Sequence, residues 1–149
     1  MGRAAEIRTV DLPPDRAFAL WTDLGRAPSF VEGFAHAEEA DGWPEKGGKL
    51  VWRSVPGGRG TVTERVVESE RPRRLVTLVF EDRLEGRQTI TFEPAEEGSR
   101  VTLELDWKLL GGGPFGFLTD ALFVRPRQRE ALGRTLRRFG VEAAEEGAR

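Results

Sequence analysis

A long amphipathic stripe near the C-terminus constrains the fold more than any other feature of the sequence. The stretch from about Pro114 to Glu146 places apolar side chains on one stripe when successive residues turn by about 100°. The members of this stripe are Leu118, Leu122, Leu132, Leu136, Phe139 and Ala143. The pattern predicts one long helix that buries a single face against another layer of the protein.

Two arginines interrupt the apolar stripe of this helix. A guanidinium group on a buried face costs free energy unless it contacts water, a carboxylate or a bound anion. One interpretation is that Arg129, in preference to Arg125, points into a ligand cavity and binds an acidic or carbonyl group. The other is that Pro126 begins or kinks the helix, so that both arginines reach solvent or pair with glutamates of the strands.

Extended segments separated by turn residues fill most of the chain before the helix. The expected strands span residues 4–12, 34–41, 48–55, 60–69, 74–81, 86–94 and 99–109. In the last of them, apolar residues alternate with polar ones from Val101 to Leu109, which predicts one buried and one exposed face. Gln88 is in phase with the apolar face of its strand. Since the helix carries the only long apolar stripe, we expect it to cover the sheet.

Prolines and a glycine punctuate the segment between the first two strands. Pro13 and Pro14 end the first strand and favour a helix that runs through Asp23. Gly25 breaks that helix, and a second short turn carries Pro28. We therefore expect an α+β fold in which two short helices connect the first two strands, a seven-stranded antiparallel sheet follows, and residues 1–149 form a single domain.

Composition excludes several classes of protein. The chain has no cysteine, which removes disulfides and thiolate metal sites, and its only histidine, His36, is expected to be exposed, so we predict neither a metal nor a cofactor. With 23 basic and 25 acidic residues the formal charge is −2, which disfavours nucleic acid as a partner. The many arginines interspersed with glutamates weakly favour a thermophilic source.

Hydropathy and a glycine-rich segment bear on localisation and on nucleotide binding. The sequence contains neither a run long enough to span a membrane nor a leader, so we expect a cytoplasmic protein; its oligomeric state stays open. Residues 111–116 match G-x-G-x-x-G, but no second strand follows the helix, so we reject a dinucleotide site. Their glycines form either a hinge beside a cavity or a turn before the helix.

The order of elements and three short motifs resemble the START-like helix-grip superfamily, which includes polyketide cyclase/dehydrase-like and pollen-allergen proteins. VDLPPDRAF at residues 10–18 is similar to the family's apolar-x-Ala-Pro-x-x-x-Val-Trp motif, with departures at Leu12, Ala17 and Phe18. Asp23 followed by PSFV at 28–31, and EGSRVT at 97–102, extend the likeness over nearly the whole chain.

This resemblance implies a helix-grip fold, in which a curved sheet wraps around the long helix and encloses an apolar cavity. It implies binding or transport of a hydrophobic small molecule such as a lipid, isoprenoid or polyketide-like compound; a cyclase or dehydratase is the alternative, and a protein-interaction module a weaker one. The expected ligand-binding residues are Trp21, Phe30, Phe34, Trp52, Phe80, Phe92, Trp107, Phe115, Phe117, Leu122, Arg125 and Arg129.

Carboxylates are the remaining candidates for chemistry in such a cavity. Glu6, Glu64 and Glu68 could each face inward, because their strands alternate imperfectly. An inward carboxylate would be either an acid/base group with a pKa raised by burial or the partner of Arg129. The sequence pattern does not choose among the three.

Overall fold

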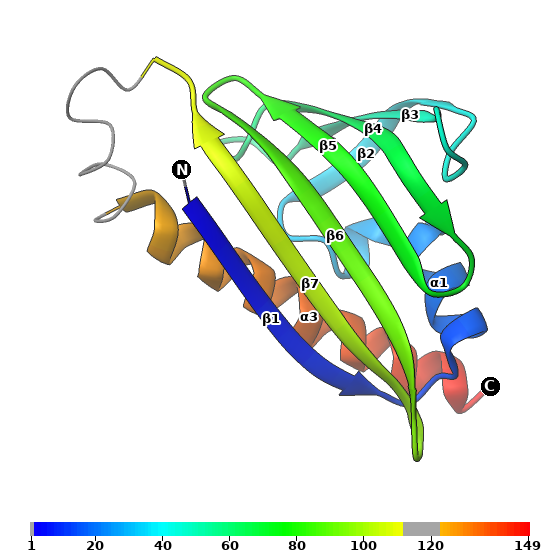
Figure 1. Cartoon of the computed structure of the whole chain (residues 1–149). Coiled ribbons are helices and arrows are strands. Elements are labelled where there is room, and N and C mark those ends of the chain that lie inside the picture. Colours follow the sequence, from blue (N-terminus) through cyan, green and yellow to red (C-terminus); the bar gives the residue numbers. More distant parts are fainter. Residues whose placement is uncertain (1, 112–122) are drawn as a thin grey trace.

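The computed structural model, which describes residues 2–111 and 123–149, shows an α+β fold with one curved antiparallel sheet (Figure 1). Its strands are β1 (Gly2–Val10), β2 (Phe34–Asp41), β3 (Lys49–Ser54), β4 (Thr61–Glu70), β5 (Arg74–Glu81), β6 (Leu84–Ala95) and β7 (Gly98–Leu109). The strand order is β1-β7-β6-β5-β4-β3-β2, so β1 and β2 form the two edges. The predicted seven-stranded antiparallel sheet is confirmed.

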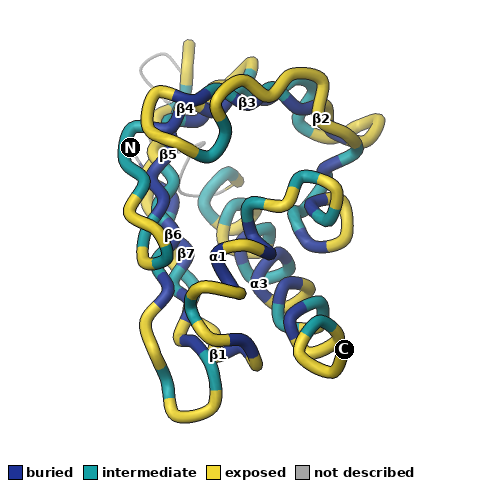
Figure 2. Tube along the Cα trace, turned by 90° about the vertical axis from the view of Figure 1, so that its right-hand side faces the viewer, coloured by how far each residue is buried: buried dark blue, intermediate teal, exposed yellow. Residues whose placement is uncertain are grey.

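Within the described residues, three helical segments pack against this sheet. They are α1 (Pro14–Thr22), the short 3-10 helix η1 (Ala27–Ser29) and α3 (Arg125–Gly147). Proline lies in the first turn of α1, as expected from its fixed backbone angle. Viewed along the sheet, the strands bend around α1 and α3, and the buried residues lie between the two layers (Figure 2). No helix in the described ranges is long and apolar enough to cross a membrane.

The main core lies where α3 and α1 meet the sheet. Phe139 of α3 is fully buried, with ring centroids 5.4 Å from Trp21, 5.2 Å from Phe30 and 6.5 Å from Phe92. These four rings join the first helix, the connecting turn, the sheet and the long helix. The predicted stripe is confirmed for Leu132, Leu136, Phe139 and Ala143, all of which are buried. Leu118 and Leu122 lie outside the described residues.

A smaller core cluster lies toward the β2 edge of the sheet. Phe34 stacks on Trp52 with ring centroids 4.7 Å apart, and Leu50, Val62 and Val79 pack around them. This cluster is separate from the main core, although both contact the segment between α1 and β2. The sheet therefore has two apolar centres on its inner face.

Helix α3 begins at Arg125, with Pro126 in its first turn. Phe123 and Val124, which precede α3, are π-helical. Pro126 thus lies where the α-helix follows this π-helical turn. Arg129 is exposed and Arg125 is half-buried. The predicted helix extends through Glu146 as expected, whereas its proposed beginning near Pro114 and the possible hinge at residues 112–116 fall outside the described ranges.

Ion pairs attach the connector between α1 and β2 to α3. Arg26 donates to Glu142 at 2.7 Å and to Glu146 at 2.9 Å. Glu32 accepts from Arg134 at 3.0 Å and from Arg138 at 2.8 Å, and its backbone N–H donates to the Thr135 hydroxyl at 2.9 Å. These contacts fix the position of the helix relative to the rim of the sheet.

The Arg26 ion pairs predict a pH-dependent stability. The Arg26 guanidinium lowers the pKa of Glu146 below its ordinary value of 4.5, so the pair stabilises the fold above pH 4.5 and loses this effect as the pH falls through the lowered pKa. Arg26→Met should therefore melt at a lower temperature than wild type near neutral pH. The difference between the two proteins should shrink below pH 4.5.

Thermal unfolding followed by circular dichroism across this pH range measures the effect. Arg127→Met is the matched control, because Arg127 is exposed and makes no ion pair within the described residues. Its melting temperature should stay close to that of wild type at every pH. If the melting temperatures of Arg26→Met and wild type differed by the same amount at neutral and acid pH, the stabilising role of the Arg26–Glu146 ion pair would be contradicted.

Candidate functional site

An interior cavity of about 50 Å³ lies between the sheet, α3 and the connector that follows α1. Its lining includes Trp21 of the main core and Phe34, Leu50 and Trp52 of the smaller cluster near β2. Its lining is mostly aromatic and aliphatic, with a few polar side chains. The lining residues are Trp21, Leu24, Ala27, Val31, Glu32, Phe34, Trp43, Leu50, Trp52, Arg59, Glu64, Val79, Gln88, Ala131 and Thr135.

Glu64 is the most distinctive polar group of this cavity. Only 8% of the residue is exposed, and it sits on β4 between the buried residues Val62 and Val66. Its carboxylate accepts a hydrogen bond from the Trp52 indole N–H at 2.8 Å and another from the Thr77 hydroxyl at 2.9 Å. A buried carboxylate needs such donors, and these two fix its orientation toward the cavity.

A second polar side chain comes from the neighbouring strands. Gln88 of β6 lies opposite Thr77 of β5 in the sheet register, and its side chain lines the cavity as its phase in the sequence predicted. Glu64 and Gln88 therefore bring a carboxylate and an amide to one apolar interior. Together they can accept from and donate to a bound molecule.

Two half-buried side chains lie at the rim of the cavity. The guanidinium of Arg59 lies 5.2 Å from the centre of the Trp52 ring and forms an ion pair with Glu81. The Trp43 indole N–H donates to the carbonyl oxygen of Thr22 at 3.1 Å. Both residues come from turns between strands, so their positions depend on the assembled fold.

Helix α3 contributes its share of the cavity through Ala131 and Thr135. Thr135 is 6% exposed, and its hydroxyl accepts the backbone N–H of Glu32. Ala131 is half-buried, and its small side chain forms part of the cavity wall. The helix thus supplies one apolar and one anchored polar contact.

The structure distributes the predicted ligand-binding residues among several environments. Those that line the cavity are Trp21, Phe34 and Trp52. Those in the main core are Phe30, Phe92 and Trp107. Phe80 is 38% exposed, because its neighbour Val79 faces the cavity and alternate residues of a strand point to opposite faces. Phe115, Phe117 and Leu122 lie outside the described residues.

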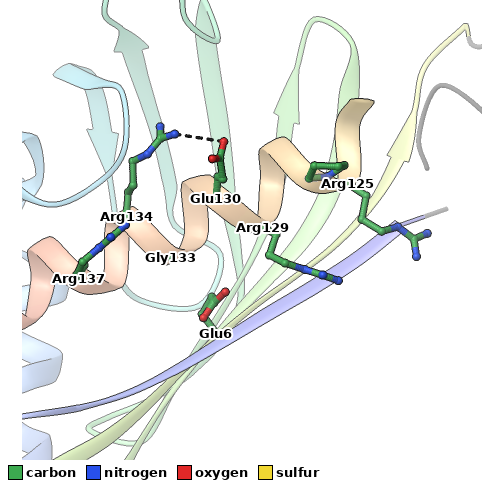
Figure 3. A pocket seen from close by; sticks show the side chains of 8 residues that line it. Glu6, Arg125, Arg129, Glu130, Gly133, Arg134 and Arg137 are labelled. Carbon is green, nitrogen blue, oxygen red and sulfur yellow. Dashed lines mark hydrogen bonds and ion pairs between the residues drawn. The ribbon is translucent and has the colours of Figure 1, made fainter. Parts of the chain in front are cut away.

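Arg125 and Arg129 line a different hollow, here called the outer groove, between β1 and the first half of α3 (Figure 3). This groove has a volume of about 570 Å³. Its lining residues are Glu6, Arg125, Pro126, Arg129, Glu130, Gly133, Arg134 and Arg137. Neither arginine belongs to the lining of the interior cavity, and Glu6 accompanies them in the groove.

Several lining residues had no signal in the local sequence pattern. Trp43 precedes a proline in a turn, and Arg59 follows two glycines in another. Glu64 was one of three equivalent carboxylates, of which Glu68 instead forms an ion pair with Arg74. Across residues 2–111 and 123–149, no three histidine, cysteine or acidic side chains gather closely enough to hold a metal ion.

The chain matches one protein-family model by its sequence and several solved proteins by its structure. Residues 1–142 match the family model described as polyketide cyclase/dehydrase and lipid transport. A protein of Thermus thermophilus is 22% identical, with a TM-score of 0.73 over 97% of this chain and 99% of that chain. No curated protein sequence matches the chain.

Two other structural matches carry functional names of their own. The di-domain ARO/CYC StfQ of the steffimycin biosynthetic pathway is 14% identical, with a TM-score of 0.77 over 99% of this chain and 52% of that chain. A point mutant of Thalictrum flavum norcoclaurine synthase, in complex with a transition-state analogue, is 16% identical, with a TM-score of 0.68 over 97% and 95% of the two chains. At these identities the likeness shows a shared fold.

The two hydrogen bonds to Glu64 predict the effect of removing its carboxylate. Glu64→Leu leaves the Trp52 indole and the Thr77 hydroxyl without their acceptor, and we expect the free energy of unfolding to fall by about 2 kcal/mol. Glu68→Leu, on the same strand, breaks only a half-exposed ion pair and should cost less than about 1 kcal/mol. Urea denaturation measures both values. Equal losses in the two variants would contradict the structural role of Glu64.

Proposed function

The chain belongs to the polyketide cyclase/dehydrase and lipid transport family, and on that basis we propose that it binds a hydrophobic small molecule in the interior cavity. The observation that carries the proposal is the aromatic lining around one buried, hydrogen-bonded carboxylate. Apolar walls with a few fixed polar groups are typical of ligand sites. A lipid, an isoprenoid or an aromatic polyketide-like compound has the required chemistry.

In this proposal the ligand contacts both the aromatic and the polar side chains that line the cavity. Trp21, Phe34 and Trp52 bury apolar surface of the ligand, which contributes roughly 25 cal/mol for each Å² removed from water. Glu64 and Gln88 fix its orientation by accepting from or donating to a hydroxyl, amine or carbonyl group. Sequestration or transport requires no more than these contacts.

The size of the cavity sets a condition on binding. Sites for drug-sized ligands measure roughly 300 Å³ or more, whereas this cavity measures about 50 Å³. Binding therefore requires lining side chains to move. Arg59 and Trp43 are half-buried beside the cavity. Rearrangement of Arg59 would enlarge the space without disturbing the main core, whereas Trp43 packs against both core clusters.

Filling the cavity from α3 tests the proposal. Ala131→Phe places a ring in the interior space, so we expect it to abolish binding of the uncharged dye N-phenylnaphthylamine and to remove any small molecule that copurifies with the protein. Val141→Phe is the matched control, because Val141 is 57% exposed on the same helix. Dye fluorescence and native mass spectrometry measure the two effects.

The control should bind the dye as wild type does. Absence of binding to wild type, together with a mass that always equals that of the bare chain, would contradict the proposal. Equal binding by wild type and Ala131→Phe would place the dye elsewhere on the protein. Circular dichroism establishes that each variant is folded.

A cyclase or dehydratase acting on a polyketide-like substrate is the second candidate, and the convergence of Glu64 and Gln88 favours it. A carboxylate inside an apolar cavity can take a proton from a carbon next to a carbonyl, while an amide donates to the carbonyl oxygen. Substrate folding within the walls would bring the reacting carbons together.

Glu64→Gln separates the two candidates, because it keeps the size of the side chain and removes its basicity. If the protein is an enzyme, incubation with an aromatic polyketide precursor should give a cyclised or dehydrated product with wild type and at least about a hundredfold slower with the variant. If the protein only binds, both should return the precursor unchanged. Liquid chromatography with mass spectrometry identifies the product.

A further inference from the structure

We propose that the outer groove between β1 and α3 is a second ligand site, which binds a phosphate group. It lies on a different face of α3 from the cavity, since Ala131 and Thr135 line the cavity while Arg129, Gly133 and Arg137 line the groove. Its volume of about 570 Å³ is in the range of small-molecule sites. The inference goes beyond the proposed function of the cavity.

The charges of the groove favour an anion. Four arginines and two glutamates line it, an excess of two positive charges in a chain whose formal charge is −2. Arg134 is already committed, because it pairs with Glu130 at 3.3 Å and with Glu32 at 3.0 Å. This pair with Glu130 points away from β1 (Figure 3). With Arg134 and Glu130 set aside, the lining still contains more arginines than glutamates, and this positive charge favours a phosphate dianion.

Arg129 and Arg137 are the arginines most suited to hold such a group. Within the described ranges neither forms a hydrogen bond or an ion pair, and both are exposed along the groove. They lie eight residues apart on α3, which corresponds to about 12 Å along the helix. Guanidinium groups match the oxygens of phosphate in pairs, and two long side chains can converge on one group between them.

Two features near these arginines weaken the helix locally, and a bound anion would relieve the first of them. Arg125 and Arg129 stand at positions i and i+4, where like charges disfavour a helix. Gly133, in the interior of α3, disfavours it further. Its missing side chain leaves the groove open opposite Glu6, whose Oε1 would lie 3.8 Å from a methyl group at this position.

Substitution of Glu6 should strengthen phosphate binding, whereas substitution of the arginines should weaken it. The Glu6 carboxylate lies on the β1 side of α3 near Arg129 (Figure 3), and it repels a bound phosphate. Its neutralisation in Glu6→Gln should strengthen phosphate binding severalfold. A gain of affinity cannot come from a loss of folding.

The experiment titrates the full chain with inorganic pyrophosphate by isothermal calorimetry. It also measures cosedimentation with phosphatidylcholine vesicles that contain phosphatidic acid. Arg129→Gln/Arg137→Gln should weaken binding about tenfold. The matched control is Arg65→Gln/Arg100→Gln, since these two arginines are exposed on strands and make no ion pair in the described part of the chain. It should bind within about twofold of wild type.

The two probes distinguish the sources of the phosphate group. Binding to pyrophosphate without binding to the vesicles supports a soluble phosphorylated ligand, and binding to the vesicles alone supports a lipid headgroup. The proposal is overturned if wild type binds neither probe. It is also overturned if the control double variant loses as much affinity as Arg129→Gln/Arg137→Gln, or if Glu6→Gln binds no more tightly than wild type.

Discussion

The structure depends on the packing of α3 against the inner face of the sheet. Phe139 lies at the centre of this contact, where it meets Trp21, Phe30 and Phe92. Complete burial of one such side chain stabilises a fold by about 1.5–3 kcal/mol, and here four rings from four parts of the chain are buried together. A sheet with one apolar face needs this helix, and the helix, with its single stripe, needs the sheet. Arg26 and Glu32 then fix where along the rim the helix lies.

The same packing explains why a cavity lies to one side of the helix. The sheet curves around α3 toward β2 (Figure 2). The aromatic cluster of Phe34 and Trp52 packs near this end of the sheet. Glu64 occupies the boundary between the two cores. A carboxylate there satisfies the indole N–H of Trp52, which has no other acceptor in the described residues. The polar network is therefore part of how the smaller cluster packs, and it also supplies the polar contact of the proposed ligand site.

The fold could be predicted from the sequence because apolar residues in each strand and helix repeat with the period of that element. Alternation placed Gln88 on the inner face, and the helical stripe identified the buried side of α3. The candidate site was harder to predict. A β-bulge between Val66 and Glu68 breaks the alternation of β4, so the sequence could not distinguish Glu64 from Glu68. The spacing of apolar residues in α3 also did not indicate which edge of its apolar stripe borders the cavity. Arg129 lies on the β1 side, while Ala131 lies on the cavity side.

The close approach of β1 to α3 gives the helix two independent surfaces. Gly140 is in the helix interior, where glycine costs about 1 kcal/mol relative to alanine. A methyl group at this position would lie 2.7 Å from Nε of Arg8 and 3.3 Å from its Cδ, so the side chain of β1 occupies the space that a larger residue would take. A methyl group at Gly133, seven residues earlier, would lie at ordinary contact distance from the side chain of Glu6, 3.8 Å from its Oε1. Helix propensity is thus lost along the line where the edge strand contacts α3. Gly133 and Gly140 face β1, whereas Ala131 and Thr135 face the cavity. Substitutions on the β1 side of α3 therefore leave the cavity contacts in place, and substitutions on the cavity side leave the contacts with β1 in place.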